Sequence, residues 1–475
     1  MRLGAGRAAP GREGEGIIVR HALRCVAFVA GLGEAGGDGR GKGNSAGRTG
    51  RENENDYEKE NDFRGTDRAW RGWVCRALLA GMSVFTELFS HRMQQLRPST
   101  IREILKVTAQ PEIISFAGGL PAPELFPIEA VRAAADDVLV RHGREALQYG
   151  PSEGFGPLRD WIAAEMHSRG VKAEAAQVLV TNGSQQVLDL AGKLFLNPGD
   201  VVLTENPTYL AAIQAFQTLE ARFVPVPTDG QGLIPEALPE LIARHRPKFL
   251  YTIPNFQNPT GTTLAAPRRA VLARIAAEHG LAVIEDDPYG KLRYRGEEVP
   301  PVKHWDEAGC VLYVSTFSKT IAPGLRLGWV LAPAEVFSRL LILKQASDLH
   351  TSSFDQRVAH AYLAGHDVPA HLERIRRTYG ERFGMMDAAL RSEMPAGFTW
   401  TQPEGGMFLW VTGPAELDGL ELLGRAIKRQ VAFVPGRDFF PGDGGGNHLR
   451  LNFSNSTPER IREGVRRLAA LCREP

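Results

Sequence analysis

The main evidence for the fold is the segment Val178-Leu-Val-Thr-Asn-Gly-Ser-Gln-Gln-Val-Leu-Asp-Leu-Ala-Gly-Lys-Leu-Phe195. Its first four residues are an apolar run that predicts a strand, and Ser184–Phe195 has the apolar spacing of a helix. The same alternation recurs along the chain, with further strands expected at 201–204, 249–253, 282–285, 311–315 and 327–331. Short apolar strands that alternate with helices predict an α/β fold with a largely parallel sheet covered on both faces.

The length of 475 residues suggests more than one domain. After about residue 370 the expected helices lengthen, and strands at 408–411 and 449–453 predict a smaller α+β domain. We therefore expect a large domain at 130–369, a C-terminal small domain at 370–475, and an N-terminal arm with part of the small domain at 82–129. Residues 1–81 hold 17 of the 51 glycines, and we expect a disordered extension or residues upstream of a true start at Met82.

The composition excludes several classes of function. A net charge of +1 gives no support for a nucleic-acid or anionic-membrane partner. The 4 cysteines have neither metal-site spacing nor the density of a disulfide scaffold, which fits a reducing, cytoplasmic compartment. No apolar run approaches the roughly 18–20 residues that span a bilayer. We expect a cytoplasmic enzyme with no metal site.

Polar groups collect where the expected strands end, and ligands of parallel sheets bind at that edge. The turn Asn182-Gly-Ser-Gln185 opens a helix, whose N-terminal N–H groups can bind a phosphate. An ordinary capped helix would give the same pattern. Asn258-Pro-Thr-Gly261 is turn chemistry as well. Asp286 and Asp287 follow a buried strand, so at least one of them should meet a cation.

The most informative segment is Ser315-Thr-Phe-Ser-Lys319, which is followed by Arg326. A desolvated lysine at a strand end has a lowered pKa and can condense with a carbonyl. Arg326 suits bidentate binding of a phosphate. The structural alternative is a lysine that caps helix carbonyls and an arginine in a surface ion pair.

Together these segments require one ligand with a phosphate, a carbonyl, a ring nitrogen and a phenolic oxygen. Pyridoxal 5'-phosphate (PLP) has all four. A carboxylate beside the pyridine nitrogen keeps that nitrogen protonated, and the ring then accepts electron density from the substrate's α-carbon.

The order of these motifs resembles that of fold-type-I, class I/II aminotransferases from about Ser99 to the C-terminus. The segments Ile114-Ser-Phe-Ala-Gly-Gly-Leu-Pro-Ala-Pro-Glu-Leu-Phe-Pro127 and Leu147-Gln-Tyr-Gly-Pro-Ser-Glu-Gly154 are similar to the 2-aminoadipate/kynurenine aminotransferase subgroup. The resemblance implies PLP as cofactor, a mostly parallel seven-stranded sheet, and a homodimer with shared active sites.

The resemblance also implies a role for each matching position. Lys319, Asp286 and Tyr209 would be catalytic: the lysine holds the cofactor and moves a proton, the aspartate pairs with the ring nitrogen, and the tyrosine stacks on the ring. Further cofactor contacts would come from Asn258 and Tyr289 at the ring oxygen, from Ser184, Gln185, Ser318 and Arg326 at the phosphate, and from Tyr149 at the phosphate of the other subunit.

The resemblance implies that the substrates are an amino acid and a 2-oxo acid. Arg450 would bind the α-carboxylate, with Asn258 and Gly119 beside it, while Arg102 and Ser99 would bind a distal carboxylate. Alternatively, Arg102 lies on a helix surface and contacts no ligand. We expect 2-aminoadipate with 2-oxoglutarate first, and aromatic, kynurenine or branched-chain amino acids next. An aminotransferase-like transcription regulator is disfavoured, because residues 1–81 lack helix-turn-helix patterning.

Overall fold

The computed structural model describes residues 85, 88–96 and 110–474. The chain divides into two units, Met1–Glu87 and Leu88–Pro475, and only Phe85 of the first unit is described. The expected N-terminal extension at 1–81 and the expected substrate residues Ser99 and Arg102 lie outside the described residues. The domain boundaries expected from the sequence stay a prediction.

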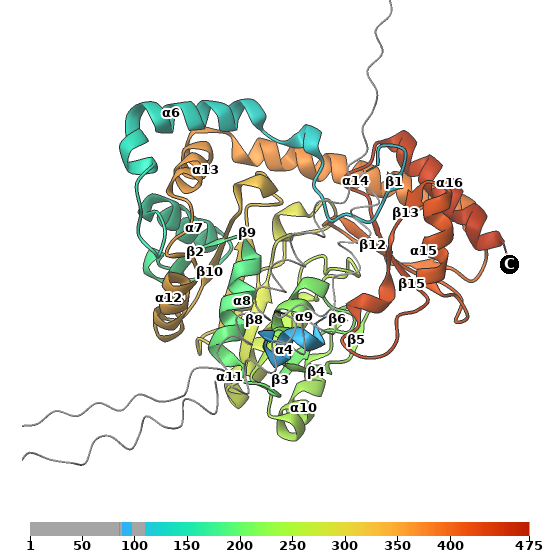
Figure 1. The fold of residues 1–475 in the computed structure, drawn as a ribbon, viewed down its shortest axis with the longest axis horizontal. Helices are drawn as coiled ribbons and strands as arrows, with labels where there is room; N and C mark the ends of the chain where they lie inside the picture. The colour runs from blue at the N-terminus through green and yellow to red at the C-terminus, as the bar shows by residue number, and fades with distance from the viewer. Residues whose placement is uncertain (1–84, 86–87, 97–109, 475) are drawn as a thin grey trace, which may run out of the picture. The chain divides into compact units, whose positions relative to one another are not determined.

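The centre of the second unit is a seven-stranded sheet (Figure 1). All neighbouring strands are parallel except β10, which is antiparallel to both of its neighbours. This confirms the α/β fold with a mostly parallel sheet. The strand order is β2 (Val178–Asn182), β10 (Leu327–Leu331), β9 (Val311–Thr316), β8 (Ala282–Asp286), β7 (Phe249–Thr252), β3 (Val201–Thr204) and β4 (Arg222–Pro225).

Helices cover the sheet on both faces, and successive residues of one strand enter different core clusters. In β2, Leu179 packs in the cluster that contains α8, whereas Val178 and Val180 pack in the cluster that contains α7 and α13. This alternation explains why the strands read as continuous apolar runs. The helices of this part are α6 (Ile128–Ala146), α7 (Gly156–Ser168), α8 (Ser184–Phe195), α9 (Leu210–Gln217), α10 (Leu238–His245), α11 (Ala266–His279), α12 (Ala334–Asp348) and α13 (Ser353–Gly365).

The edge strand β4 was not among the strands expected from the sequence. Its four residues, Arg222-Phe-Val-Pro225, are exposed at both ends and only partly buried between them. An edge strand of this kind lacks the continuous apolar run that revealed the inner strands.

The smaller α+β part surrounds a four-stranded sheet, ordered β11 (Thr399–Trp400), β12 (Phe408–Thr412), β15 (His448–Asn452) and β14 (Val434–Pro435). The early strand β1 (Ile114–Ser115) pairs in parallel with β13 (Val431–Ala432), so the segment before the large sheet joins this part. Its helices are α14 (Val368–Glu393), α15 (Gly419–Lys428) and α16 (Pro458–Arg473). The described chain also contains the short α4 helix (His91–Gln95), the hairpin of β5 (Thr228–Asp229) and β6 (Gly232–Leu233), and several short 3-10 helices.

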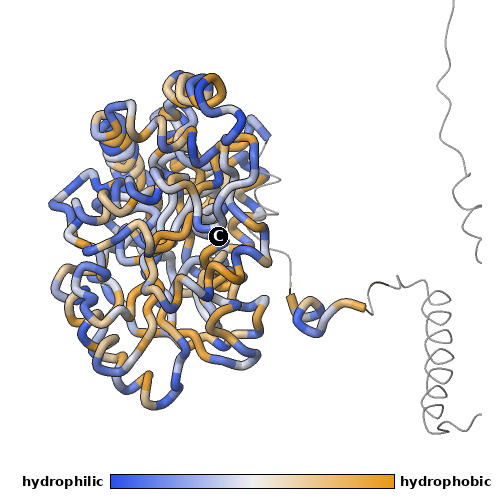
Figure 2. Tube along the Cα trace, turned by 90° about the vertical axis from the view of Figure 1, so that its left-hand side faces the viewer, coloured by the Kyte–Doolittle hydropathy of each residue, from blue (hydrophilic) through white to orange (hydrophobic). Residues whose placement is uncertain are grey.

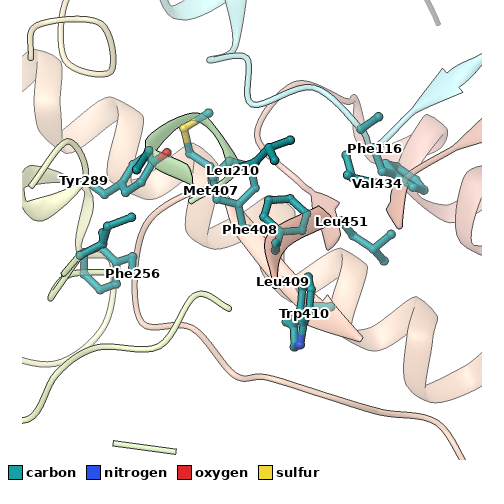
Figure 3. Packing of buried hydrophobic residues seen from close by; sticks show 14 of the residues in the cluster. Phe116, Leu210, Phe256, Tyr289, Met407, Phe408, Leu409, Trp410, Val434 and Leu451 are labelled. Carbon is teal, nitrogen blue, oxygen red and sulfur yellow. The ribbon is translucent and has the colours of Figure 1, made fainter. Parts of the chain in front are cut away.

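One core cluster continues from the large sheet into the smaller part. Figure 3 shows Phe408 between Tyr289 on one side and Leu451 on the other. In Figure 2 the apolar residues gather on the inner segments. Within the described part of the chain, no helix is long and apolar enough to cross a membrane.

Strand β10 approaches the turn before α8 so closely that only a glycine fits. A Cβ atom on Gly328 would lie 2.4 Å from the backbone carbon of Gly183 and 2.4 Å from the backbone nitrogen of Ser184. Because both contacts are backbone atoms, no side-chain rotation relieves them. The turn is thus fixed against the sheet.

We predict that Gly328→Ala lowers the free energy of unfolding by about 1–3 kcal/mol, because the added methyl group overpacks a rigid contact. Gly384→Ala is the matched control, since its added Cβ would meet nothing within 4 Å in the interior of α14. That control should raise the free energy of unfolding by about 0.5–1 kcal/mol. Denaturant titration measures both values, and an unchanged Gly328→Ala protein would contradict the close approach.

Candidate active site

A cavity of about 450 Å³ lies at the carboxyl ends of β8 and β9 and beside the start of α8. Phe408, Phe439 and Arg450 line it from the smaller part. The residues that the sequence predicted and that line this cavity are Gly119, Ser184, Gln185, Tyr209, Asn258, Asp286, Tyr289, Ser318, Lys319, Arg326 and Arg450. The structure therefore brings together residues that lie far apart in the chain.

One end of the cavity has the chemistry of a phosphate site. Gly183 caps α8 without a side-chain hydrogen bond, at a φ of 73° that favours glycine. A Cβ on Gly183 would lie 2.6 Å from Nη2 of Arg326, so the guanidinium reaches the start of the helix. The hydroxyl of Ser318 lies 2.9 Å from Oγ1 of Thr316, which donates to the carbonyl of Leu327. A helix N-terminus, a guanidinium and a hydroxyl fit a phosphate dianion.

The carboxylate of Asp286 lies at the end of β8, where it is 2% exposed. Its Oδ2 accepts a hydrogen bond of 2.7 Å from the hydroxyl of Tyr251, whereas its Oδ1 is buried without a partner. Burial, opposed by the Tyr251 bond and helped by the charge of Asp287, raises the pKa of Asp286 to about 7. A buried carboxylate oxygen without a partner fits a protonated pyridine nitrogen.

The neighbouring Asp287 is fully satisfied by protein groups. Its oxygens accept from Arg169 at 2.9 Å, from Asn255 at 2.9 Å and from Tyr313 at 2.7 Å. Burial alone would raise the pKa of Asp287, but Arg169 and these hydrogen bonds outweigh it and lower the pKa. The expectation that at least one of the two acids meets a cation is therefore met by Asp287.

Lys319 follows β9, and its Nζ donates a hydrogen bond of 2.9 Å to the carbonyl of Gly119. Burial, assisted by the positive charges of Arg450 and Arg326, lowers the pKa of Lys319 to about 8. A far larger share of the amine is therefore neutral near neutral pH than in an ordinary lysine, and the neutral form is the one that condenses with a carbonyl.

Arg450 on β15 is 3% exposed and is held by the protein on two sides. Its Nη1 donates to Oδ1 of Asn258 at 2.9 Å and its Nη2 to the carbonyl of Ala117 at 2.7 Å, while its Nε is buried without a partner. The guanidinium stacks over Phe408 at 4.3 Å and over Phe439 at 5.0 Å. Burial lowers the pKa of Arg450 to about 10, so the cation persists at neutral pH and fits a carboxylate.

Tyr209 is the N-cap residue of α9, and Tyr289 follows β8 with its ring edge-on to Phe408. Burial raises the pKa of Tyr289 far above its usual range, and Asn258 hydrogen-bonds its side chain. Both tyrosines line the cavity, and Tyr289 does so as a neutral phenol.

Not every predicted residue lies well inside the cavity. Tyr149 is 78% exposed and its ring contacts His350, with centroids 5.7 Å apart. Gln185 lines the cavity but is exposed, and its amide donates to the carbonyl of Ala211 at 3.3 Å. In the described part of the chain, no group of three or more His, Cys, Asp or Glu side chains could hold a metal ion.

Sequence reasoning missed the residues that support the site from behind. Tyr251, Arg169, Asn255 and Tyr313 hold the two aspartates, but no motif marks them, because they come from other strands, from the loop after β7 and from the end of α7. It also missed apolar lining residues. These are Leu210, Ala211, Ile253, Pro288, Pro323, Phe408 and Phe439.

The fold, the phosphate site and the open carboxylate oxygen together define a fold-type-I, PLP-dependent class of enzyme. Residues 112–468 match the family described as Aminotransferase class I and II, and the chain belongs to this family of PLP-dependent aminotransferases.

Three relatives support this placement. The chain is 44% identical over 396 residues to the aromatic-amino-acid aminotransferase 1 of Thermococcus litoralis, covering 82% of this chain and 95% of the relative. It is 45% identical over 387 residues to the 2-aminoadipate transaminase of Thermus thermophilus, covering 81% and 96%. The crystal structure of the alpha-aminoadipate aminotransferase from Thermus thermophilus, complexed with N-(5'-phosphopyridoxyl)-L-leucine, matches with a TM-score of 0.77, 43% identity, and coverage of 82% and 98%.

The lowered pKa of Lys319 predicts how the protein stripped of cofactor captures PLP. The rate of covalent capture should rise with pH and level off above about 8, rather than near the ordinary lysine value of 10.5, because only the neutral amine reacts. Arg450→Met removes one of the nearby positive charges, so the midpoint should move to higher pH. Stopped-flow absorbance at a series of pH values measures the midpoint.

Arg132→Met is the control, because Arg132 is exposed on α6 and lies outside the cavity lining. Its midpoint should equal that of the wild type. A wild-type midpoint near 10.5, or an Arg450→Met midpoint that does not move, would contradict the electrostatic account.

Proposed function

We propose that the enzyme transfers the amino group of 2-aminoadipate to 2-oxoglutarate, reversibly. The observation that carries this proposal is the cavity itself, in which Lys319, the open oxygen of Asp286 and the guanidinium of Arg450 face one space. Such a space accommodates a cofactor and an amino acid with its α-carboxylate on the arginine.

The cofactor, when bound, supplies a protonated ring that accepts electron density from the substrate's α-carbon. Lys319 binds the cofactor and, once released, moves a proton between the α-carbon and C4' of the cofactor. Its low pKa suits this work, because a general base acts best when its pKa lies near the working pH. The hydrogen bond to Gly119 holds its Nζ at the edge of the cavity.

Asp286 would keep the ring nitrogen protonated through its open oxygen Oδ1, since Tyr251 holds the other carboxylate oxygen. Asn258 and Tyr289 would donate to the ring oxygen, and Tyr209 would pack against the ring face. The phosphate is bound by the N–H groups at the start of α8 and by the side chains of Ser184, Gln185, Ser318 and Arg326.

Arg450 binds the α-carboxylate of the substrate. It is already oriented by Asn258, Ala117 and two aromatic rings, so little side-chain entropy is lost on binding. Gly119 beside Lys319 leaves room for a long substrate side chain, since a Cβ there would already lie 3.2 Å from Phe408.

The choice of 2-aminoadipate rests on Arg102 and Ser99 as ligands of the distal carboxylate. The identities of 44% and 45% to an aromatic-amino-acid and to a 2-aminoadipate enzyme favour neither substrate over the other. Aromatic, kynurenine and branched-chain amino acids are therefore the alternative substrates.

We also propose a homodimer in which Tyr149 reaches the phosphate of the partner's site. The exposure of this aromatic side chain, together with Val140 at 85% and Leu147 at 75%, supports an interface on this side of α6. A cytoplasmic location stays a prediction of the sequence.

A panel of half-reactions tests the proposal. The holoenzyme is mixed with single amino acids, and the conversion of bound PLP to its amino form is followed by absorbance. 2-Aminoadipate should react faster than leucine or phenylalanine, and Lys319→Ala should lose about a hundredfold or more of this rate, because a general acid–base group contributes that much. Conversion by no amino acid at all would refute the proposal, and an unimpaired Lys319→Ala protein would refute the assigned roles.

Arg102→Ala tests the substrate class. Without a cation for the distal carboxylate, the rates with 2-aminoadipate and glutamate should fall about tenfold or more, whereas those with leucine and phenylalanine should stay within about twofold. An equal effect on all four amino acids would favour the aromatic or branched-chain alternative.

A further inference from the structure

An ion pair between a buried lysine and an aspartate whose side chain is 23% exposed lies beside the turn that opens α8. Lys344, on α12, has a fully buried side chain, and its Nζ lies 2.7 Å from both carboxylate oxygens of Asp348 at the end of the same helix. Lys193 and Asp189 form a pair with the same spacing on α8, with side chains 42% and 38% exposed. The Lys344–Asp348 pair therefore has a different environment from an ordinary helix-surface pair.

Asp348 connects this pair to the turn. Its Oδ2 accepts from the amide of Gln186 at 2.8 Å and also from the side-chain amide of Asn182. Gln186 in turn accepts from the backbone N–H of Asn182 at 2.9 Å. The carboxylate thus holds Asn182 and Gln186, the two ends of the turn, on either side of Gly183 and Ser184.

Stability alone does not explain a lysine in this position. Removing an ammonium group from water is costly, and an ion pair formed by a buried lysine seldom recovers more than that cost. What such a pair provides is a fixed position for its oxygens. Here the fixed oxygens point at the turn that approaches β10 at Gly328 and meets Arg326 at Gly183.

We propose that Asp348, oriented by Lys344, is a positioning residue for the phosphate-binding turn 182–186. It holds the turn from the side away from the cavity, so that the N–H groups at the start of α8 are directed at the phosphate before the cofactor arrives. This inference rests on the phosphate site of the proposed function. It requires that Asp348 affects binding of the phosphate group and has little effect on binding of the ring.

Comparing PLP with pyridoxal, which lacks the phosphate, separates these two effects. Dissociation constants of the full-length protein are measured by equilibrium dialysis. Asp348→Ala should weaken PLP binding about tenfold or more, because hydrogen bonds to a charged group are lost. Pyridoxal binding should stay within about twofold, and turnover at saturating PLP should be retained. An equal loss for both ligands, or no loss for PLP, would overturn the inference.

Two further variants keep the result interpretable. The double variant Lys344→Met/Asp348→Leu leaves no unpaired buried charge, so it folds even if Asp348→Ala does not, and it should show the same selective loss. Asp189→Ala, on the exposed face of α8, is the matched control and should change neither constant. A double variant that binds PLP like the wild type would overturn the inference.

Arg326→Ala separates this inference from the proposed phosphate site. If Arg326→Ala weakens PLP selectively and the Asp348 variants do not, the phosphate site stands and the positioning role of Asp348 is wrong. If neither weakens PLP selectively, both are wrong. A selective loss of PLP binding in both Arg326→Ala and the Asp348 variants supports the inference. In that case, inorganic phosphate should compete less well with PLP in the Asp348 variants than in the wild type.

Discussion

The site depends on a buried carboxylate at the end of β8 that has one oxygen held and one oxygen open. Tyr251 binds Oδ2 of Asp286, and Oδ1 has no protein partner. Such an oxygen is unfavourable in an empty protein, because a buried acceptor without a donor costs free energy. It becomes favourable when a protonated ring nitrogen binds it. On the proposed function, the binding energy of the cofactor and the function of this carboxylate would have the same origin.

The surrounding charges are arranged around this oxygen. Asp287 is neutralised by Arg169, so the second acid of the pair does not compete for the cofactor. Lys319, Arg326 and Arg450 bring three positive groups to the same cavity, and their mutual repulsion helps to lower the pKa of Lys319. A net charge of +1 for the whole chain conceals this local concentration.

The sequence predicted most of the cavity, because residues that follow parallel strands must meet at one edge of the sheet. Asp286, Lys319 and Ser184 each lie at or just after the end of an apolar strand. The short motifs around them indicate a site for a phosphate and a carbonyl compound. Arg169, Tyr251 and the Lys344–Asp348 pair were not predicted, because their function depends on contacts between segments far apart in the chain. The edge strand β4 was missed for a different reason, its partial exposure. The substrate-binding roles of Ser99 and Arg102 remain predictions.

The central claim is that Asp286 keeps the ring nitrogen of the bound cofactor protonated. The most direct test is the NMR chemical shift of that nitrogen in holoenzyme prepared with isotope-labelled PLP, for the wild type and for Asp286→Asn. We predict the shift of a protonated pyridine in the wild type at neutral pH, and that of an unprotonated pyridine in Asp286→Asn with PLP still bound. An unprotonated nitrogen in the wild type, or the same shift in both proteins, would contradict the account.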